Sequence, residues 1–251
     1  STTPSPELST TTDVPASATS FPPPTTAPSA TSFDGFTFLR DFYRRLAFDP
    51  FAAAEVAEAT TLGSTANSFM LHEVVVAIAI LGHTTAPLPS YTVVADGPAV
   101  AVCRDDGACE TFSDFVLVGT ALDTFAIDGQ PMAQRASAYE RPTTVETLTI
   151  DSSYAVRRPR DELLSVVVLL AAEGGGTTFG WDQASYVDAT GLQHPVDAVN
   201  SQFPGRLEDG DFAVAHVSFP GAQHGGQVVI PITTDLTGVA TTIRVPVVTV
   251  R

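Results

Sequence analysis

The chain has 251 residues, 44% of them apolar, and a formal net charge of -16. That charge argues against nucleic acid as a partner, because neutralising phosphates requires clustered basic side chains. It also disfavours binding to anionic lipid head groups. All twelve basic residues are arginine, so chemistry that needs a lysine, such as a Walker-type phosphate loop or a Schiff base, is excluded.

Residues 1–32 have a biased composition, in which proline, serine and threonine supply 23 of the 32 positions. Such a segment cannot bury enough apolar surface to offset the entropy of ordering, so we predict a disordered tether. No apolar run reaches the roughly 18 residues of a membrane-spanning helix, and the longest, residues 74–81, is predicted to be core. Because the chain begins with Ser1, we expect a signal region, and allow for a lipid anchor, upstream of it.

Helical periodicity begins after residue 33. A first amphipathic helix is indicated by apolar residues at i, i+3, i+4 and i+7, which are Leu39, Phe42, Tyr43 and Leu46. Asp49 followed by Pro50 is typical of a helix start and predicts a short helix to about residue 60. Ser64 is expected to cap a third helix that ends at Gly82.

After Pro89 the pattern changes to short runs of β-branched and aromatic residues, separated by glycine, aspartate or proline. With the three helices, these runs predict an α+β domain over residues 33–140. Residues 145–251 contain longer runs, with turn signals at the spacing of an antiparallel β-sandwich. We therefore predict two domains joined by a linker at residues 140–144.

The only two cysteines, Cys103 and Cys109, flank an Asp-Asp-Gly sequence. A structural metal site needs four ligands, and a thioredoxin-like redox pair needs two intervening residues rather than five. A three-residue hairpin loop with Gly107 in the left-handed conformation places the cysteines opposite each other on antiparallel strands, within disulfide reach. We predict a disulfide, which stabilises by roughly 2 kcal/mol and implies an oxidising compartment.

The segments LGSTANSFMLHE and VAVCRDDGACETFSDFVLVGTALDTFAIDGQPMAQR resemble exported actinobacterial lipoproteins of the NTF2-like superfamily, whose fold is a cystatin-like α+β cone. The matching positions are Gly63-Ser64-Thr65-Ala66, Cys103, Cys109, Phe112, Phe115, Phe125 and Asp128-Gly129. This resemblance covers about residues 36–136 and implies an apolar concavity between helix and sheet. The later segment FPGRLEDGDFAVAHVSFP resembles the immunoglobulin-like β-sandwich often placed beside such domains.

Enzymes of the NTF2-like superfamily carry an acid–base pair in the concavity, and the corresponding candidates are Tyr43, His72, Asp114 and Asp123. An acid–base site requires a carboxylate of raised pKa in an apolar pocket, whereas Asp114 is equally explained as a residue that braces the sheet. His72-Glu73 begins a zinc-protease motif, but Val76 stands where the second histidine belongs, so no such site is predicted.

Other candidate motifs have simpler explanations. The remaining histidines are scattered along the sequence, and His216 is expected to be a sheet residue on the face of Phe212 and Val214. No G-x-S-x-G nucleophile motif or dinucleotide-binding fingerprint occurs, so a hydrolase triad has no support and no cofactor is predicted. An acidic turn contains three carboxylates that are candidate ligands for Ca²⁺: Glu208, Asp209 and Asp211. The turn lacks EF-hand spacing, and acidic residues beside glycine are common in ordinary turns, so no metal is predicted. Trp181 is predicted to be core.

We therefore expect an exported, cell-surface-attached protein of the cell envelope with a non-enzymatic binding or structural role, whose partner is a protein or a small apolar ligand. One alternative is an isomerase- or dehydratase-type enzyme acting on a small apolar ligand in the cone. Asp114, Asp123 or His72 pointing inward beside a tyrosine favours that enzyme, and a cone filled by apolar side chains excludes it. A second alternative is a self-assembling surface or filament subunit in which residues 1–32 dock on a neighbour.

Overall fold

Three α-helices precede a long series of antiparallel strands in the computed structural model, which describes residues 33–85, 87–160 and 162–247. The predicted tether at residues 1–32 lies outside the described residues. The helices are α1 (Gly35–Phe48), α2 (Pro50–Ala57) and α3 (Thr65–His83), and the 3-10 helices are η1 (Met132–Gln134), η2 (Trp181–Gln183) and η3 (Ala198–Asn200). The described residues form one compact unit.

The helix starts follow the capping signals in the sequence. The side chain of Asp49 accepts hydrogen bonds from two backbone amides of α2, and Pro50 occupies the first helical position, as predicted. Ser64 Oγ accepts a hydrogen bond of 3.1 Å from the amide of Asn67 and caps α3. Two predicted helix ends were slightly wrong. α2 ends at Ala57 rather than near residue 60, and α3 continues past Gly82 to His83. Burial keeps the β-branched run of α3 helical.

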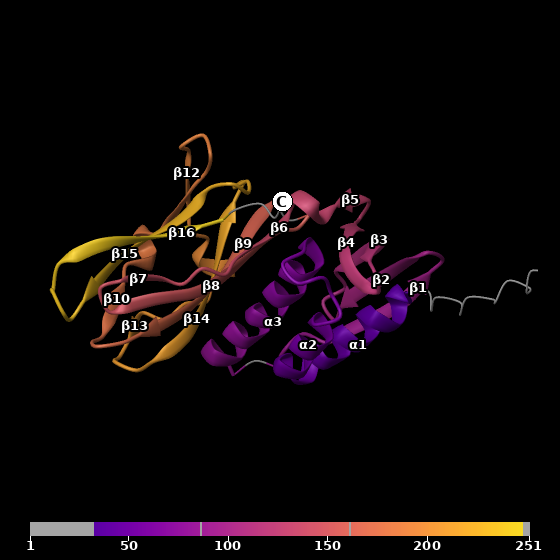
Figure 1. Cartoon of the computed structure of the whole chain (residues 1–251), viewed down its shortest axis with the longest axis horizontal. Helices are drawn as coiled ribbons and strands as arrows, with labels where there is room; N and C mark the ends of the chain where they lie inside the picture. Colours follow the sequence, from indigo (N-terminus) through magenta and orange to yellow (C-terminus); the bar gives the residue numbers. More distant parts are fainter. Residues whose placement is uncertain (1–32, 86, 161, 248–251) are drawn as a thin grey trace, which may run out of the picture. The chain divides into compact units, whose positions relative to one another are not determined.

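The first sheet lies beside the helices (Figure 1) and runs in the order β1-β2-β3-β4-β5, with every neighbouring pair antiparallel. Its strands are β1 (Tyr91–Asp96), β2 (Ala99–Arg104), β3 (Cys109–Val118), β4 (Ala121–Ile127) and β5 (Gln130–Pro131). Phe69 of α3 packs edge-on against Phe112 and Phe125, with ring centroids 6.0 and 5.2 Å away. These rings fill the space between α3 and the middle of the sheet.

Two further antiparallel sheets are built from the rest of the chain. The second has the order β14-β9-β8-β6, with β7 also paired to β8, and the third has the order β12-β11-β15-β10-β13, with β16 also paired to β15. Their strands are β6 (Ala136–Tyr139), β7 (Thr143–Val145), β8 (Leu148–Arg157), β9 (Leu163–Ala172), β10 (Thr177–Phe179), β11 (Ser185–Val187), β12 (Gln193–Pro195), β13 (Arg206–Leu207), β14 (Phe212–Pro220), β15 (Gln227–Thr234) and β16 (Ala240–Pro246).

The second and third sheets bury a common apolar core. Alternate residues of β9, including Leu164 and Val166, meet residues of β15 and β16 such as Ile230 and Ile243 in this core. Trp181 belongs to it as predicted: the residue is 3% exposed, and its Nε1 donates a hydrogen bond of 2.6 Å to the carbonyl of Pro204. The antiparallel β-rich second half expected from the sequence is therefore present.

The segment chosen as a linker lies inside the second sheet. β6, before the proposed linker, pairs with β8 from Ala136 to Tyr139, and β7 begins at Thr143 within the linker and pairs with the same strand. The pairing of β6 and β7 with β8 is not evident from the sequence, because both strands are short and they flank the turn residues of the ERPTT segment. As a result, β8 receives partners from the chain on both sides of the predicted boundary.

α3 is long and apolar enough to cross a membrane by length and composition, but 67% of its most apolar window is buried inside the protein. One side packs into the core with the first sheet, through residues such as Phe69 and Val74. Another side, with Val75 and Ala79, packs against Val167 of the second sheet. A helix that is apolar all round is expected to be buried in this way, and it holds the first and second sheets close together.

The cysteine hairpin has the predicted register. Cys103 pairs with Cys109 across β2 and β3, and Gly107 has a φ of 86°, the left-handed conformation that the turn requires. The two cysteines form a disulfide. Their Cα atoms are 3.9 Å apart, closer than the sequence-based expectation for opposed strand residues.

Candidate functional site

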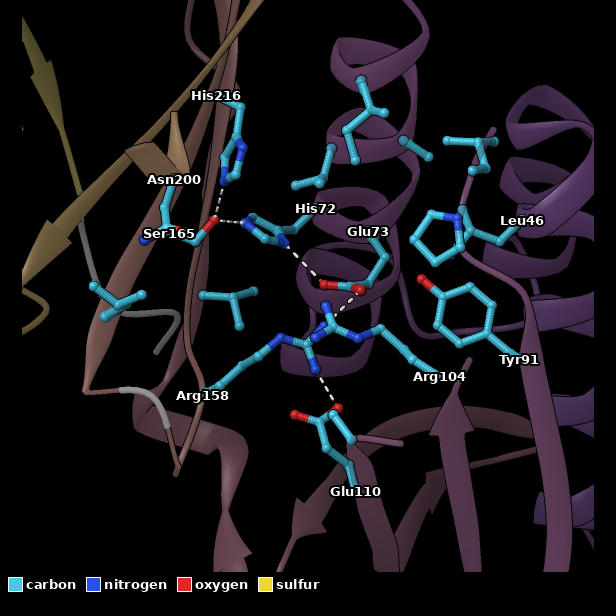
Figure 2. Close-up of a pocket in the computed structure, with 18 of the residues that line it drawn as sticks. Leu46, His72, Glu73, Tyr91, Arg104, Glu110, Arg158, Ser165, Asn200 and His216 are labelled. Carbon is cyan, nitrogen blue, oxygen red and sulfur yellow. Dashed lines mark hydrogen bonds and ion pairs between the residues drawn. The ribbon is translucent and has the colours of Figure 1, made fainter. Parts of the chain in front are cut away.

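A pocket of about 350 Å³ lies where α1, α3 and the first sheet meet β9 and β14 of the second sheet (Figure 2). This size is within the range of small-molecule sites. One wall is apolar and is contributed by Leu46, Val76, Ala77, Ile80, Leu88 and Pro89. The remaining lining carries charged and hydrogen-bonding side chains, so the pocket offers an apolar ligand a small number of directional contacts.

Three charged side chains cross the pocket as one ion-paired triad, which we call the buried triad: Glu73, Arg158 and Glu110 (Figure 2). Arg158 Nη2 lies 2.6 Å from Glu73 Oε2, and its Nη1 pairs with Glu110. The side chains of Glu73 and Arg158 are 8% and 25% exposed. Two carboxylates therefore face one guanidinium in a largely dry environment.

The charges of the buried triad fix its protonation. Burial alone would raise the pKa of Glu73, but the charge of Arg158 and the contact with His72 outweigh it and lower that pKa to about 2. Burial alone would lower the pKa of Arg158. The charges of Glu73 and Glu110 outweigh the effect of burial and raise the Arg158 pKa well above its ordinary value. Glu73 and Arg158 therefore stay ionised over the whole neutral range.

A hydrogen-bonded chain leads from Glu73 across the pocket to the second sheet (Figure 2). His72 Nδ1 lies 3.1 Å from Glu73 Oε1, and His72 Nε2 lies 2.8 Å from Ser165 Oγ. On its other side Ser165 Oγ lies 2.8 Å from His216 Nε2, and His216 Nδ1 lies 2.9 Å from Gln202 Oε1. Two histidines, one from a helix and one from a strand, thus share a single serine hydroxyl.

The hydrogen bonds of this chain define where protons can sit. A carboxylate only accepts hydrogen bonds, so His72 Nδ1 carries a proton toward Glu73. The hydroxyl group of Ser165 has one proton and donates it to only one of the two Nε2 atoms, so the other imidazole must donate its own Nε2 proton to Ser165 Oγ. Burial lowers the pKa of His216 to about 4, so this imidazole is neutral near pH 7.

Two tyrosines lie together at the pocket, and one of them has a hydroxyl group without a partner among the residues that the structure describes. Tyr43, 1% exposed, has a buried hydroxyl group without a hydrogen bond, and its ring centroid lies 4.8 Å from that of Tyr91. Both side chains line the pocket. Burial, and then the charge of Glu73, raise both tyrosine pKa values, so the phenols remain protonated donors.

The structure brings together only two of the four candidates for an acid–base pair. Tyr43 and His72 line the pocket, whereas Asp114 and Asp123 do not. Asp114 is exposed at an irregularity of β3, has a φ of 52°, and accepts a hydrogen bond from Ser113. Asp123 lines a separate cavity near the start of α3. The expectation that an aspartate of the first sheet could face the concavity is therefore not met.

The acidic turn considered for Ca²⁺ uses its side chains within the protein. Asp209 accepts hydrogen bonds from the amides of Gly174 and Gly175, and Asp211 accepts one from the amide of Glu208. The carboxylate of Glu208 pairs with Arg206. Among the described residues, no group of three or more histidine, cysteine, aspartate or glutamate side chains is arranged to hold a metal.

Sequence reasoning missed most of the site. It treated the histidines as scattered, but His72 and His216 converge on Ser165, and it singled out neither Arg158 nor Glu110. The only available signal was the adjacent pair His72-Glu73 in an apolar helix, since polar residues there need buried partners. Those partners lie 85 and 93 positions away along the chain, for Arg158 and Ser165 respectively.

Comparison with known proteins returns no match. No family model, no curated protein and no solved structure matches this chain. The resemblance to NTF2-like lipoproteins and to immunoglobulin-like sandwiches stays a prediction.

Proposed function

We propose that this chain is an exported protein of the cell envelope that binds a small, mainly apolar molecule with a hydrogen-bond acceptor in the pocket described above. The observation that carries the proposal is the combination of an apolar wall with the buried, unpartnered hydroxyl group of Tyr43, whose ring packs beside that of Tyr91. A buried hydroxyl group without a partner costs about 1–3 kcal/mol. A ligand oxygen that accepts a hydrogen bond from the Tyr43 hydroxyl group would remove that cost.

The oxidised cysteine pair supports the exported location. Disulfides persist in oxidising compartments and are rare in reducing ones. The Cys103–Cys109 bridge joins β2 and β3 directly beside Glu110, so it also holds one end of the buried triad. Export would therefore stabilise the pocket as well as the hairpin.

The arrangement of elements supports the finer fold assignments that we propose. Three helices packed on an antiparallel sheet agree with an NTF2-like domain, and two antiparallel sheets over one core agree with an immunoglobulin-like sandwich. In this proposal the pocket belongs to neither domain alone. The first contributes Tyr43, His72 and Glu73, and the second contributes Ser165 and His216.

The isomerase- or dehydratase-type alternative receives less support. It needs a carboxylate of raised pKa in an apolar site, yet Asp114 and Asp123 lie outside the pocket and the pKa of Glu73 is lowered. The self-assembly alternative depends on residues 1–32, which lie outside the described part of the chain. Ligand binding is therefore the function that we propose.

A matched pair of probes tests this proposal. 2-Acetylnaphthalene carries a carbonyl acceptor, and 2-ethylnaphthalene has a similar shape without it. We expect ligand-observed NMR to show binding of both, with the acetyl compound at least several-fold tighter. Val76→Trp fills the pocket and should abolish binding, while Leu81→Trp, on the same helix but exposed and outside the lining, should preserve it. Absence of binding to the wild type, or unchanged binding to Val76→Trp, would overturn the proposal.

A further inference from the structure

We propose that Ser165 is a nucleophile for acyl transfer, with His72 as its general base and Glu73 as the carboxylate that orients His72. The substrates would be small esters with an apolar acyl group. This inference rests on the proposed binding pocket, because the same apolar wall would hold the acyl chain. It adds a covalent step that binding alone does not require.

Ser165, His72 and Glu73 are hydrogen-bonded in the order that nucleophilic catalysis needs. An activated serine requires a base within hydrogen-bond reach, and that base requires a third group to orient it. Here Ser165 Oγ and the carboxylate of Glu73 lie on opposite nitrogens of the same imidazole, at 2.8 and 3.1 Å. Arg158 binds the other carboxylate oxygen of Glu73, so Oε1 remains directed at His72.

Strand geometry exposes Ser165 to the pocket. Side chains alternate along β9, so Leu164 and Val166 enter the core between the second and third sheets. Ser165 and Val167 point the other way, toward α3, where Val167 packs against Val75. Ser165 is only partly buried and lines the pocket, so a bound molecule has access to its hydroxyl group.

Two histidines compete for the hydroxyl proton of Ser165, and the groups behind them decide between them. Proton transfer turns the acceptor into an imidazolium, which the carboxylate of Glu73 stabilises and the neutral amide of Gln202 does not. Burial already lowers the pKa of His216 to about 4. His72 is therefore the base, and the neutral His216, protonated at Nε2, donates a hydrogen bond that holds the serine oxygen in position. Its unprotonated Nδ1 then accepts from the side-chain amide of Gln202, turned to present its NH2 group.

The reaction can be written with every atom placed. Ser165 Oγ attacks the acyl carbon, its proton moves to His72 Nε2, and an Oγ–C bond forms. The bond from the acyl carbon to the alcohol oxygen then breaks, and the leaving alkoxide takes the proton from His72. Water attacks the resulting acyl-serine, gives its proton to His72, and releases the carboxylic acid as Ser165 Oγ recovers that proton.

The environment of β9 predicts a slow reaction. Fast acyl transfer uses backbone N–H groups aimed at the developing oxyanion. β9 pairs with β8 on one side and β14 on the other, with Ser165 opposite Val156 and Ser218, so the backbone around it belongs to the sheet. We therefore expect stoichiometric acylation to be easier to observe than rapid turnover.

Diisopropyl fluorophosphate tests the nucleophile, since attack by a serine oxygen on phosphorus releases fluoride and leaves a stable adduct. We expect one adduct on the full-length protein, located at Ser165 by peptide mass spectrometry and absent from Ser165→Ala. His72→Gln should slow labelling by roughly 100-fold or more, the usual contribution of a general base. His216→Leu should be labelled more slowly than the wild type, because the serine oxygen loses a hydrogen bond, but faster than His72→Gln, because the base remains.

Ser137 is a second serine that contacts a histidine, but it is buried, 2% exposed, and outside the pocket lining. Its hydroxyl group lies 3.3 Å from His224 Nδ1, but the other nitrogen of that ring contacts the backbone carbonyl of Arg135 rather than a carboxylate. Ser137 should remain unlabelled, and Ser137→Ala should label like the wild type. Thermal unfolding of each variant, followed by circular dichroism, checks that a loss of labelling is not a loss of fold.

Three outcomes would overturn the inference: no adduct on the folded wild type, an adduct at another residue, or wild-type labelling rates for His72→Gln. Failure of the inference is distinguishable from failure of the binding proposal. If 2-acetylnaphthalene binds and no adduct forms, only the nucleophile is rejected. If the adduct forms at Ser165 and 2-acetylnaphthalene neither binds nor slows labelling, the binding proposal fails while the nucleophile stands.

Discussion

Arg158 and Arg206 each bind two carboxylates, in very different surroundings. Arg158 binds Glu73 and Glu110 in the pocket, where the three side chains are 25%, 8% and 19% exposed. The second group, which we call the exposed triad, is Arg206 with Glu208 and Asp235, and its side chains are 38%, 68% and 53% exposed. The chemical groups are nearly the same, but only the buried triad has lost most of its water.

The difference shows that burial, more than pairing, decides what an ion pair does. Exposed pairs are screened and contribute little to stability. Buried pairs repay a large desolvation cost only while they are complete, and replacing a buried set with apolar residues is often neutral or stabilising. A protein whose only need was stability could use an apolar cluster here, so the buried triad points to a role in holding His72 and a ligand.

The largest effect is expected from removing the central arginine of the buried triad. Arg158→Met leaves the carboxylates of Glu73 and Glu110 facing each other without a counter-charge, which costs about 3–5 kcal/mol in comparable buried sites. Urea unfolding followed by circular dichroism measures the loss. The triple variant Arg158→Met, Glu73→Gln, Glu110→Gln should recover much of it, because no unpaired charge remains.

Arg206→Met is the matched control in the exposed triad, and we expect little change in its unfolding midpoint because water replaces the lost partner. Equal losses for Arg158→Met and Arg206→Met would break the comparison between the two triads. Failure of the triple variant to recover stability would show that Arg158 acts through packing rather than through charge.

A second test uses pH. The pKa of Glu73 is about 2 in the folded protein against an ordinary value of 4.5, so its stabilisation is complete above pH 4.5 and is lost as the pH falls toward 2. A shift of this size corresponds to about 3 kcal/mol. We expect the wild type to lose this stability between pH 4.5 and 2, and Glu73→Gln to lack that loss, measured by urea unfolding at each pH.

The buried histidines act in a different pH window. Burial lowers the pKa values of His216 and His224 to about 4 from 6.5, so their contribution is complete above pH 6.5 and is lost as the pH falls to 4. The two proteins share the loss from His224, but the charge of Glu73 also raises the pKa of His216, so the difference between wild type and Glu73→Gln reports Glu73 together with its effect on His216. Parallel stability curves below pH 4.5 would show that the buried triad does not hold Glu73 ionised.

The smallest effect on stability is expected at Tyr43, beside the buried triad. Tyr43→Phe removes a hydroxyl group that has no partner, so thermal unfolding should show no loss, or a gain of up to about 1 kcal/mol. Binding of 2-acetylnaphthalene should weaken several-fold in ligand-observed NMR. Unchanged stability together with weaker binding would sharpen the comparison between the two triads, because it would show that a polar group near the buried triad contributes to ligand binding and not to stability.

Tyr186 serves as the control for that substitution. Its hydroxyl group donates to the carbonyl of Gln223 at 2.6 Å and accepts from the amide of Gly226 at 2.8 Å. Tyr186→Phe should therefore destabilise the protein, by about 1–3 kcal/mol, without changing the affinity for 2-acetylnaphthalene. A stability loss in Tyr43→Phe equal to that in Tyr186→Phe would contradict the assignment of Tyr43.

Local elements were the predictable part of the fold. Asp49 and Ser64 cap α2 and α3 as expected, and the turn at Gly107 sets the register that joins Cys103 to Cys109. Each of these features depends on residues within about six positions of one another. Longer-range choices were harder: the short strands β6 and β7 pair with β8, although their residues read as a domain end and a linker.

The candidate site was only half accessible to sequence reasoning. Tyr43 and His72 were candidates because of a family resemblance, and both line the pocket. Asp114 and Asp123 came from the same resemblance and lie elsewhere, since one sits at an irregularity of β3 and the other beside the start of α3. Ser165 had no motif around it, because its chemistry arises from partners on α3 and β14.

By itself the sequence determined the composition, the absence of lysine, the helix starts, the hairpin and the β-rich second half. All of these are set by neighbours along the chain or by overall amino-acid content. Only the tertiary structure decided that Glu73, His72, Ser165 and His216 form one hydrogen-bonded chain beside Arg158. The physical reason is that α3 is apolar on every side, so it packs against both the first and the second sheet and carries two polar side chains into the junction between them.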